Sequence, residues 1–526
     1  MKKLYKNDIE DLEIVLNAIE RGDLEDAGSF DVLKRLLNDP TIPQDVIEII
    51  YWNCVYEASY GTFHSGFTLP KYPEIVEWDK GKAKIHYDAL TDYIIKLFIP
   101  LTYKKQIWVW NGEKWKENEG EIERTITYFL KKEGISDERK IRDTINEILA
   151  RISWLTIVHE FPFNNLGTEF IPLKNGVLWR GHNYELLPNG PAFGYTFKLP
   201  VKYDPKAECP KIDKFISEVV DEENIPILYE IPALALMQNP WHQTAYMLVG
   251  SGSNGKSTYL KLIETFLGKE NVSNISLQEL CEDRFKAAEL VGKLANIYAD
   301  LPKNPIRYTG KFKMLTGGDR ILVEKKYKDP FPIENKAVFV FSANELPQVN
   351  DQTYAFWRRW IIVEFPNTFE KNEGLIEELT TEEELSGFLN KVLLAMTRIE
   401  VKGVTRTKAV ERIMEEWMKK ANSVYAFVQD CIERDIHSYE LKDTVYQYYL
   451  EYCEMNELNP LPKNKFSAEF QRLAKARSAR KKIGGQRMYI WEGIRLKTSY
   501  FEEEETSEAE ETFAEQEWDL THFFGG

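Results

Sequence analysis

The chain has 526 residues, of which 43% are hydrophobic and 29% charged, and this is more than one hydrophobic core can hold, so several domains are expected. No apolar run is long enough to span a bilayer, and the amino-terminal residues lack a signal-peptide core, so we expect a cytoplasmic protein without a membrane partner. The five cysteines are scattered without a Cys-x-x-Cys pair, which favours a reducing compartment and argues against a zinc site.

The first two regions are expected to differ in structure. Residues 1–84 are predicted to be a helical region, and residues 85–210 mix helix and strand patterns, which predicts an α+β domain. Within this domain Ile107–Trp110 leads into Asn111-Gly112, a pair that supplies the positive φ of a tight hairpin turn. A second strand–turn unit is expected at Asn175-Gly176. We find no alternating hydrophobic–Asp run of the type that holds polymerase metals, so nucleotide polymerisation is not expected.

A complete Walker A phosphate loop follows an apolar strand at 244–249 and leads into a helix. Its glycines let backbone N–H groups converge on phosphate oxygens, its lysine adds a positive charge, and Ser257 can complete a magnesium shell. We therefore expect ATP and Mg²⁺ as cofactors. The residues predicted to hold the nucleotide are Gly250, Ser251, Gly252, Ser253, Asn254, Gly255, Lys256, Ser257 and Thr258.

Residues 211–400 alternate apolar strands and helices, which predicts a buried parallel sheet with helices on both faces. Further strands are expected at 294–299, 337–342 and 360–365. Ligands of such sheets bind at the carboxyl ends of the strands. Asp300 follows the first of these strands and Asn344 the second, so both are candidate site residues, and Asp300 can hold Mg²⁺ directly or through water.

The last third of the chain carries an uneven charge. Residues 401–497 are predicted to form a connecting helix and then helices followed by a two-stranded ribbon, the layout of a winged-helix module. Residues 461–497 hold eleven Lys or Arg and two Glu, which favours contact with nucleic acid. Residues 501–526 hold ten acids and no Lys or Arg, so 498–526 is expected to be a disordered acidic tail.

These motifs, taken in order, resemble superfamily 3 helicases, and most closely the phage and plasmid primase-helicase family that includes the poxvirus-type enzymes. The resemblance includes the Walker A loop, the strand that ends at Asp300, Thr-Gly-Gly-Asp at 316–319 and Ser-Ala-Asn-Glu-Leu-Pro at 342–347. It implies a multidomain α/β fold with an AAA+ core at 211–400, a mixed α+β domain before it and a winged-helix domain after it, without an evident primase domain.

The resemblance also implies a function. It implies an ATP-dependent replicative DNA helicase of a virus, plasmid or integrated element. Such a protein forms a homo-hexameric ring, binds single-stranded and forked DNA, and unwinds duplex in the 3′→5′ direction at a replication site in the host cell.

The family's site residues carry over to matching positions. Lys256 and Asp300 belong to the catalytic set. Asn344 resembles the sensor that orients the attacking water, and Arg359 resembles the arginine finger that reaches the next subunit, with Arg358 as the alternative. One departure is that many relatives have paired acids at this strand end, whereas here Ala299 precedes Asp300 and Leu301 follows it, so the residue that activates water stays open.

Two further motifs are candidate binding sites, the first from the same resemblance and the second from a separate one. The family places a pore hairpin where this chain has Lys325, Lys326, Tyr327 and Lys328, with Lys326 as the principal DNA contact. The tail segment 517–524 resembles a peptide that docks on sliding clamps through Leu520, Phe523 and Phe524.

Two other functions stay open. One is an origin-binding initiator that uses ATP to assemble, and the other is a DNA packaging or remodelling ATPase. An initiator would prefer one duplex sequence, and a remodelling ATPase would ignore single-stranded DNA.

Overall fold

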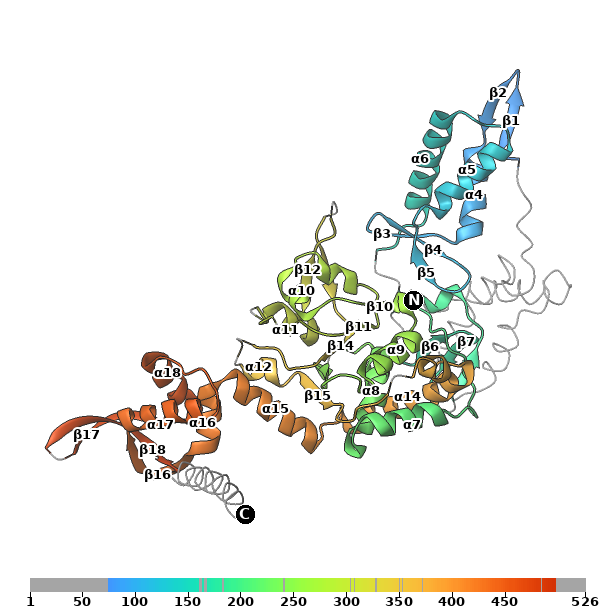
Figure 1. The fold of residues 1–526 in the computed structure, drawn as a ribbon. Helices are drawn as coiled ribbons and strands as arrows, with labels where there is room; N and C mark the ends of the chain where they lie inside the picture. The colour runs from blue at the N-terminus through green and yellow to red at the C-terminus, as the bar shows by residue number, and fades with distance from the viewer. Residues whose placement is uncertain are drawn as a thin grey trace, which may run out of the picture.

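The protein is described by a computed structural model that covers residues 74–497 except for a few short gaps. The gaps are residues 160–162, 165–167, 182–183, 240–241, 303, 307, 327–328, 350, 352, 371 and 484. Several predictions therefore lie outside the described residues: the helices before residue 74, the hairpin residues Tyr327 and Lys328, and the tail with Leu520, Phe523 and Phe524. Three parts follow one another along the molecule, with a parallel sheet in the central one (Figure 1).

The first part contains a hairpin, three helices and a small antiparallel sheet. The hairpin at residues 76–85 shows that the predicted helical region does not extend through residue 84. The predicted Asn111-Gly112 hairpin is confirmed: Trp110 pairs with Trp115 and Gly112 has φ +90. The elements are β1 (Val76–Asp79), β2 (Lys82–Ile85), α4 (Tyr87–Phe98), β3 (Leu101–Tyr103), β4 (Gln106–Trp110), β5 (Trp115–Glu117), α5 (Glu121–Lys132) and α6 (Glu138–Leu155).

A second antiparallel sheet packs on the central part. It consists of β6 (Phe170–Leu173), β7 (Gly176–Trp179) and β8 (Glu185–Leu187), and the turn at Gly176 is the one that the sequence predicts. Its side chains share one continuous hydrophobic core with the helices that follow residue 210. Arg180 Nη1 also lies 3.0 Å from Glu400 Oε1 of α14 (Glu382–Lys402). The core therefore has no break at residue 210.

The central part has the predicted parallel sheet, and its strand order is β10-β11-β14-β9-β15. Both faces are buried because Tyr246 and Leu248 of β9 enter one core and Met247 enters the other. Helices α7, α8, α9 and α14 cover the first face, and α10, α11, α12 and α15 contribute to the second (Figure 1).

The bounds of the central elements are α7 (Pro210–Val219), α8 (Ile225–Met237), β9 (Ala245–Val249), α9 (Lys256–Leu267), β10 (Val272–Ser273), α10 (Leu277–Glu282), β11 (Ala295–Tyr298), α11 (Gly310–Gly317), β14 (Val338–Ala343), α12 (Tyr354–Trp357), β15 (Trp360–Glu364) and α13 (Leu375–Leu379). Short 3-10 helices lie at Pro191–Phe193, Glu222–Asn224, Lys269–Asn271 and Lys286–Leu290. Between β11 and β14 an antiparallel hairpin is formed by β12 (Arg320–Val323) and β13 (Phe331–Glu334).

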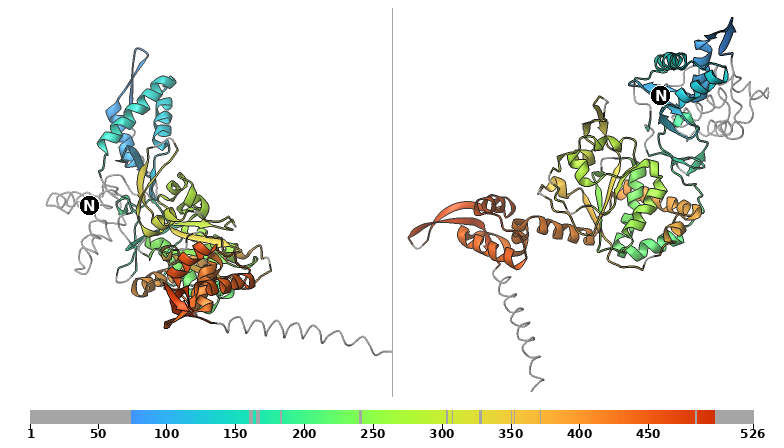
Figure 2. Two further views of the ribbon diagram at one scale, coloured as in Figure 1. Left: turned by 90° about the vertical axis from the view of Figure 1, so that its left-hand side faces the viewer. Right: turned by 45° about the horizontal axis from the view of Figure 1, so that its top comes forward.

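The third part is joined to the sheet by α15 (Lys408–Ala421), which confirms the predicted connecting helix. The predicted two-stranded ribbon is also confirmed, and it extends away from the helices in both figures (Figure 2). The sequence did not predict β16, which pairs with the other edge of β18. The elements are α16 (Ser423–Cys431), β16 (Ile432–Leu441), α17 (Lys442–Met455), α18 (Lys463–Leu473), β17 (Arg477–Ile483) and β18 (Gln486–Leu496).

Candidate active site

The glycine-rich loop joins the carboxyl end of β9 to the first turn of α9. A Cβ atom at Gly250 would lie 2.1 Å from Asn254 Nδ2 and 2.6 Å from the carbonyl oxygen of Phe365, so only glycine fits there. Gly255 has φ +87, and a Cβ atom on it would lie 2.6 Å from Val219 Cγ1. The Asn254 amide donates to the Phe365 carbonyl at 3.3 Å, which ties the loop to the end of β15.

Lys256 is the first residue of α9 and is 3% exposed. Its Nζ donates to the Gly250 carbonyl at 2.6 Å, to Asn254 Oδ1 at 3.0 Å and to Asn344 Oδ1 at 3.4 Å. Burial lowers the pKa of Lys256, and the carboxylate of Asp300 opposes that shift. Lys256 thus interacts with both other candidate residues, through a hydrogen bond to Asn344 and through the charge of Asp300. Of the other loop residues, Ser251, Ser253 and Ser257 are exposed, and Gly252 and Thr258 are half-buried.

Asp300 and Asn344 follow neighbouring strands at the edge where the glycine loop lies. Strands β11, β14 and β9 are adjacent and parallel, so their carboxyl ends meet. The Asp300 side chain is exposed, and its backbone N–H donates to Ser342 Oγ at 3.1 Å. The sequence analysis included Ser342 in the 342–347 motif but gave it no role, although a serine directly after the apolar run from Ala337 to Phe341 was the available signal.

The two candidate arginines differ in their surroundings. Arg359 is 7% exposed, and its guanidinium donates to Thr316 Oγ1 at 2.8 Å, to the Lys313 carbonyl at 3.2 Å and to the Ala355 carbonyl. Burial lowers the pKa of Arg359, and the neighbouring Arg358 lowers it further, whereas Asp319 raises it. Arg358 is exposed and donates to Gln243 Oε1 at 2.6 Å. Arg359 is therefore bound within its own chain, and Arg358 is the one that faces solvent.

The expected lysine-bearing hairpin forms between β12 and β13. Lys325 and Lys326 follow β12, Lys326 is exposed, and Lys325 Nζ lies 5.9 Å from the ring centre of Phe331. Leu322 of the same hairpin is 73% exposed. The sequence therefore predicted the hairpin correctly, and its contact with DNA stays a prediction.

A polar cluster that the sequence analysis missed joins the loop after β14 to α11. The Asp351 carboxylate accepts hydrogen bonds from Lys313 Nζ at 2.7 Å, from the Thr353 backbone at 2.9 Å and from the Thr309 hydroxyl. Burial alone would raise the pKa of Asp351, but these hydrogen bonds lower it to about 2. Since α11 runs on into β12, this cluster connects the loop after Asn344 to the lysine-bearing hairpin.

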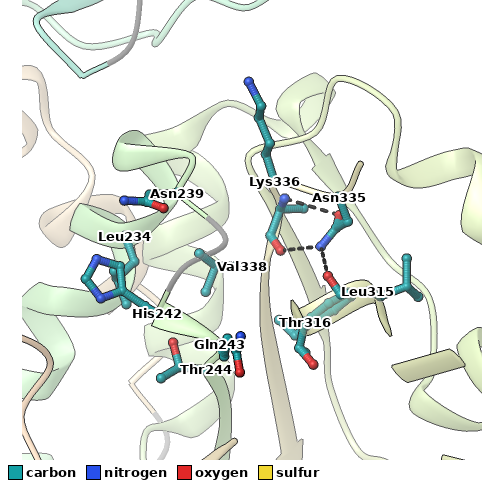
Figure 3. A pocket seen from close by; sticks show the side chains of 12 residues that line it. Leu234, Asn239, His242, Gln243, Thr244, Leu315, Thr316, Asn335, Lys336 and Val338 are labelled. Atoms are coloured by element: carbon teal, nitrogen blue, oxygen red, sulfur yellow. Dashed lines mark hydrogen bonds between the residues drawn. The ribbon is translucent and has the colours of Figure 1, made fainter. Parts of the chain in front are cut away.

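A pocket lies at the amino ends of β9 and β14, whereas the glycine loop follows the carboxyl end of β9. Figure 3 shows the side chains that line it. The Asn335 amide in its wall donates to the carbonyls of Leu315 at 3.2 Å and Ala337 at 3.0 Å. Burial lowers the pKa of His242 on the facing side. None of the predicted site residues lines this pocket, but Gln243 and Thr316, which accept hydrogen bonds from Arg358 and Arg359, do, so it adjoins the two arginines.

Comparisons with known proteins match successive parts of the chain. Residues 86–221 match the family described as D5 N terminal like, and residues 419–515 match the family described as poxvirus D5 protein-like. Residues 248–359, which contain the glycine loop and both arginines, match a family of unknown function, DUF5906.

Two viral proteins with helicase names are similar to the chain. The putative helicase L207/L206 of Acanthamoeba polyphaga mimivirus is 27% identical over 217 residues, which is 36% of this chain and 22% of the relative. The putative helicase 121R of Invertebrate iridescent virus 3 is 24% identical over 309 residues, which is 53% of this chain and 32% of the relative. Together with the D5 matches, these relatives support a primase-helicase family of the phage and poxvirus type.

The chain therefore matches less than a third of the length of each of these curated relatives. A solved structure, the C-terminal region of NrS-1, aligns over 74% of this chain and 94% of its own, with 14% identity and a TM-score of 0.46. In the part of the chain that the structure describes, we find no helix with the length and hydrophobicity needed to cross a bilayer.

Proposed function

We propose that the chain is an ATP-dependent replicative DNA helicase of a virus, plasmid or integrated element. It assembles as a hexameric ring that moves along single-stranded DNA and opens duplex in the 3′→5′ direction. The observation that carries this proposal is the meeting of Lys256, Asp300 and Asn344 at the carboxyl ends of three neighbouring parallel strands. The helicase names of the two viral relatives support it.

The residues at this edge fit a nucleoside triphosphate with magnesium. The loop is closed so tightly at Gly250 that a Cβ atom has no room, while at Gly252 nothing lies within 4 Å of one, which leaves space for a ligand to approach the backbone. Lys256 would hold phosphate oxygens, and Ser257 with Asp300 would hold Mg²⁺. Among the described residues no cluster of three His, Cys, Asp or Glu could bind a metal alone, which suits an ion that also takes phosphate oxygens as ligands.

Bound magnesium supplies charge neutralisation during phosphoryl transfer. The protein's own contribution is positional. Asn344 accepts from Lys256 Nζ and would orient the attacking water with its remaining amide hydrogens. The buried Ser342 hydroxyl fixes the backbone that carries Asp300.

The arginine pair would complete the site of the next subunit in the ring. The exposure of Arg358 supports it as the residue that reaches the neighbour, and the bonds of Arg359 to α11 and α12 support a positioning role within its own chain. A cation supplied in trans would make hydrolysis depend on assembly.

The lysines after β12 would bind the phosphates of the DNA strand that passes through the ring, whatever its base sequence. The Asp351 cluster would transmit movement of the loop after Asn344 to this hairpin. The clamp-docking role of Leu520, Phe523 and Phe524 is a separate proposal that rests on the sequence alone.

The test is unwinding of a tailed duplex by the wild type beside a Lys256→Ala variant, with ATPase followed in parallel. Stimulation of ATPase by single-stranded DNA favours the helicase. Preference for one duplex sequence without unwinding would favour an initiator, and indifference to single-stranded DNA would favour a packaging or remodelling ATPase.

A further inference from the structure

One face of the β17–β18 hairpin concentrates positive charge. In this antiparallel pair Arg480 is opposite Tyr489, and Lys482 is opposite Arg487. Because side chains alternate along a strand, these four share one face, which we call the wing face. All four are exposed, and Tyr489 has 55% of its surface accessible. The hairpin extends beyond the helices of its domain (Figures 1 and 2).

The charges on the wing face lack partners of opposite sign. Residues 479–490 contain no Asp or Glu, and no carboxylate among the described residues lies within ion-pair distance of Lys482 or Arg487. Like charges directly opposite each other on paired strands are destabilising. The Lys482–Arg487 pair thus costs stability in the isolated protein, and an external polyanion would relieve that cost.

Helix α18, which occupies the usual reading position in this layout of helices and strands, is different. Lys463 Nζ lies 2.6 Å from Asp443 Oδ1, and the Arg472 guanidinium pairs with Glu469. Two of its cations are therefore neutralised within the domain. Lys465 is the one cation of α18 without an ion pair to a described residue, so most of the uncompensated charge lies on the hairpin.

The opposite face of the hairpin supplies a comparison within the same element. Lys481 lies on that face, and its Nζ is 3.7 Å from the ring centre of Tyr439 on β16. Its ammonium group therefore makes a cation–π contact within the domain. Lys481 and Lys482 are thus adjacent exposed lysines with different surroundings.

We propose that the wing face of Arg480, Lys482, Arg487 and Tyr489 binds the sugar–phosphate backbone of duplex DNA, and that α18 does not carry this contact. The inference rests on the proposed function for its nucleic-acid partner. A two-stranded ribbon is narrow enough to enter a groove of the duplex. Single-stranded DNA is disfavoured as the ligand because binding it needs several stacking rings. The wing face offers only Tyr489, whose ring centre already lies 4.5 Å from the Arg480 guanidinium carbon.

The experiment compares full-length Lys482→Ala/Arg487→Ala with the matched control Lys481→Ala. Fluorescence anisotropy measures binding of a blunt duplex and of an oligothymidylate of the same length, without ATP, over a range of salt concentrations. The double variant should bind duplex roughly tenfold more weakly, and the slope of log affinity against log salt should fall by about 2, one unit for each lost phosphate contact. Lys481→Ala should keep the wild-type slope, and binding of oligothymidylate should change little in both variants.

Thermal melting separates this role from a structural one, because removal of the like-charged pair should leave the melting temperature unchanged or raise it. The proposal is overturned if the salt slope for duplex is unchanged in the double variant, or if Lys481→Ala loses as much duplex affinity as the double variant. If the double variant loses as much affinity for oligothymidylate as for duplex, the wing face binds single strands instead. If the wild type unwinds DNA but the double variant shows no change in salt slope, only the proposal about the wing face is refuted. If the double variant changes the slope but the wild type has no ATPase activity stimulated by DNA, only the proposed helicase function is refuted.

Discussion

Substituting the two adjacent arginines separately should give opposite patterns of stability and activity. The Arg359 guanidinium makes three hydrogen bonds to α11 and α12 from a buried position. At roughly 1 kcal/mol net for each bond, Arg359→Ala should cost about 3 kcal/mol. For a domain of this size that corresponds to a drop of roughly 6–12 °C in melting temperature. Arg358→Ala removes an exposed side chain with one bond to Gln243, so its effect on stability should stay below about 0.5 kcal/mol.

Activity should follow the other order if Arg358 acts across the subunit boundary. Arg358→Ala should melt like the wild type and lose most of its ATPase. Mixing it with Lys256→Ala subunits should restore some activity, because a junction with an intact loop on one side and an intact arginine on the other then forms. If Arg359→Ala instead melts normally, loses ATPase and is rescued by mixing, Arg359 is the finger and the role inferred from its burial is wrong.

Two other predictions concern the link between the sheet and the hairpin. Asp351→Asn should lower stability at neutral pH by roughly 1–2 kcal/mol, because its hydrogen bonds from Lys313 and Thr309 favour the charged form. Since the pKa of Asp351 is lower in the folded state, its stabilising contribution is present above about pH 4 and is lost as pH falls toward 2. The melting temperatures of wild type and variant should therefore converge in acid. A difference that stays constant with pH would contradict this. Lys326→Ala should keep basal ATPase and lose most of its stimulation by single-stranded DNA, measured with and without oligonucleotide, and full stimulation would remove this residue from the DNA contact.

The features that the sequence predicted best are those with a local cause. The loop from Gly250 to Gly255 needs glycine at fixed places, and the turn at Asn111-Gly112 follows from Asn-Gly chemistry, so both are visible in a few adjacent residues. The parallel strands were visible as apolar runs because both of their faces are buried. Their ends were predicted to within a residue or two.

Features that depend on distant partners were not visible. Strand β16 has consecutive polar residues, such as Glu433-Arg434-Asp435, in place of an alternating pattern, and it is specified by pairing with β18, which lies much later in the chain. The role of Ser342 depends on the backbone of Asp300 in a neighbouring strand. The burial of Arg359 depends on Thr316 and the Lys313 carbonyl of α11, which lie 43 and 46 residues earlier in the chain, so the motif around Arg359 does not reveal it.

We propose that ATP bound at the carboxyl ends of β9, β11 and β14 drives the separation of DNA strands. The rate at which the wild type opens a 3′-tailed duplex tests this directly. The control is Lys256→Ala, which lacks the buried ammonium group of the glycine loop. We expect ATP-dependent opening by the wild type and none by Lys256→Ala, while both proteins still bind the single-stranded tail. Opening by Lys256→Ala at the wild-type rate, or no opening by a wild type that hydrolyses ATP, would contradict it.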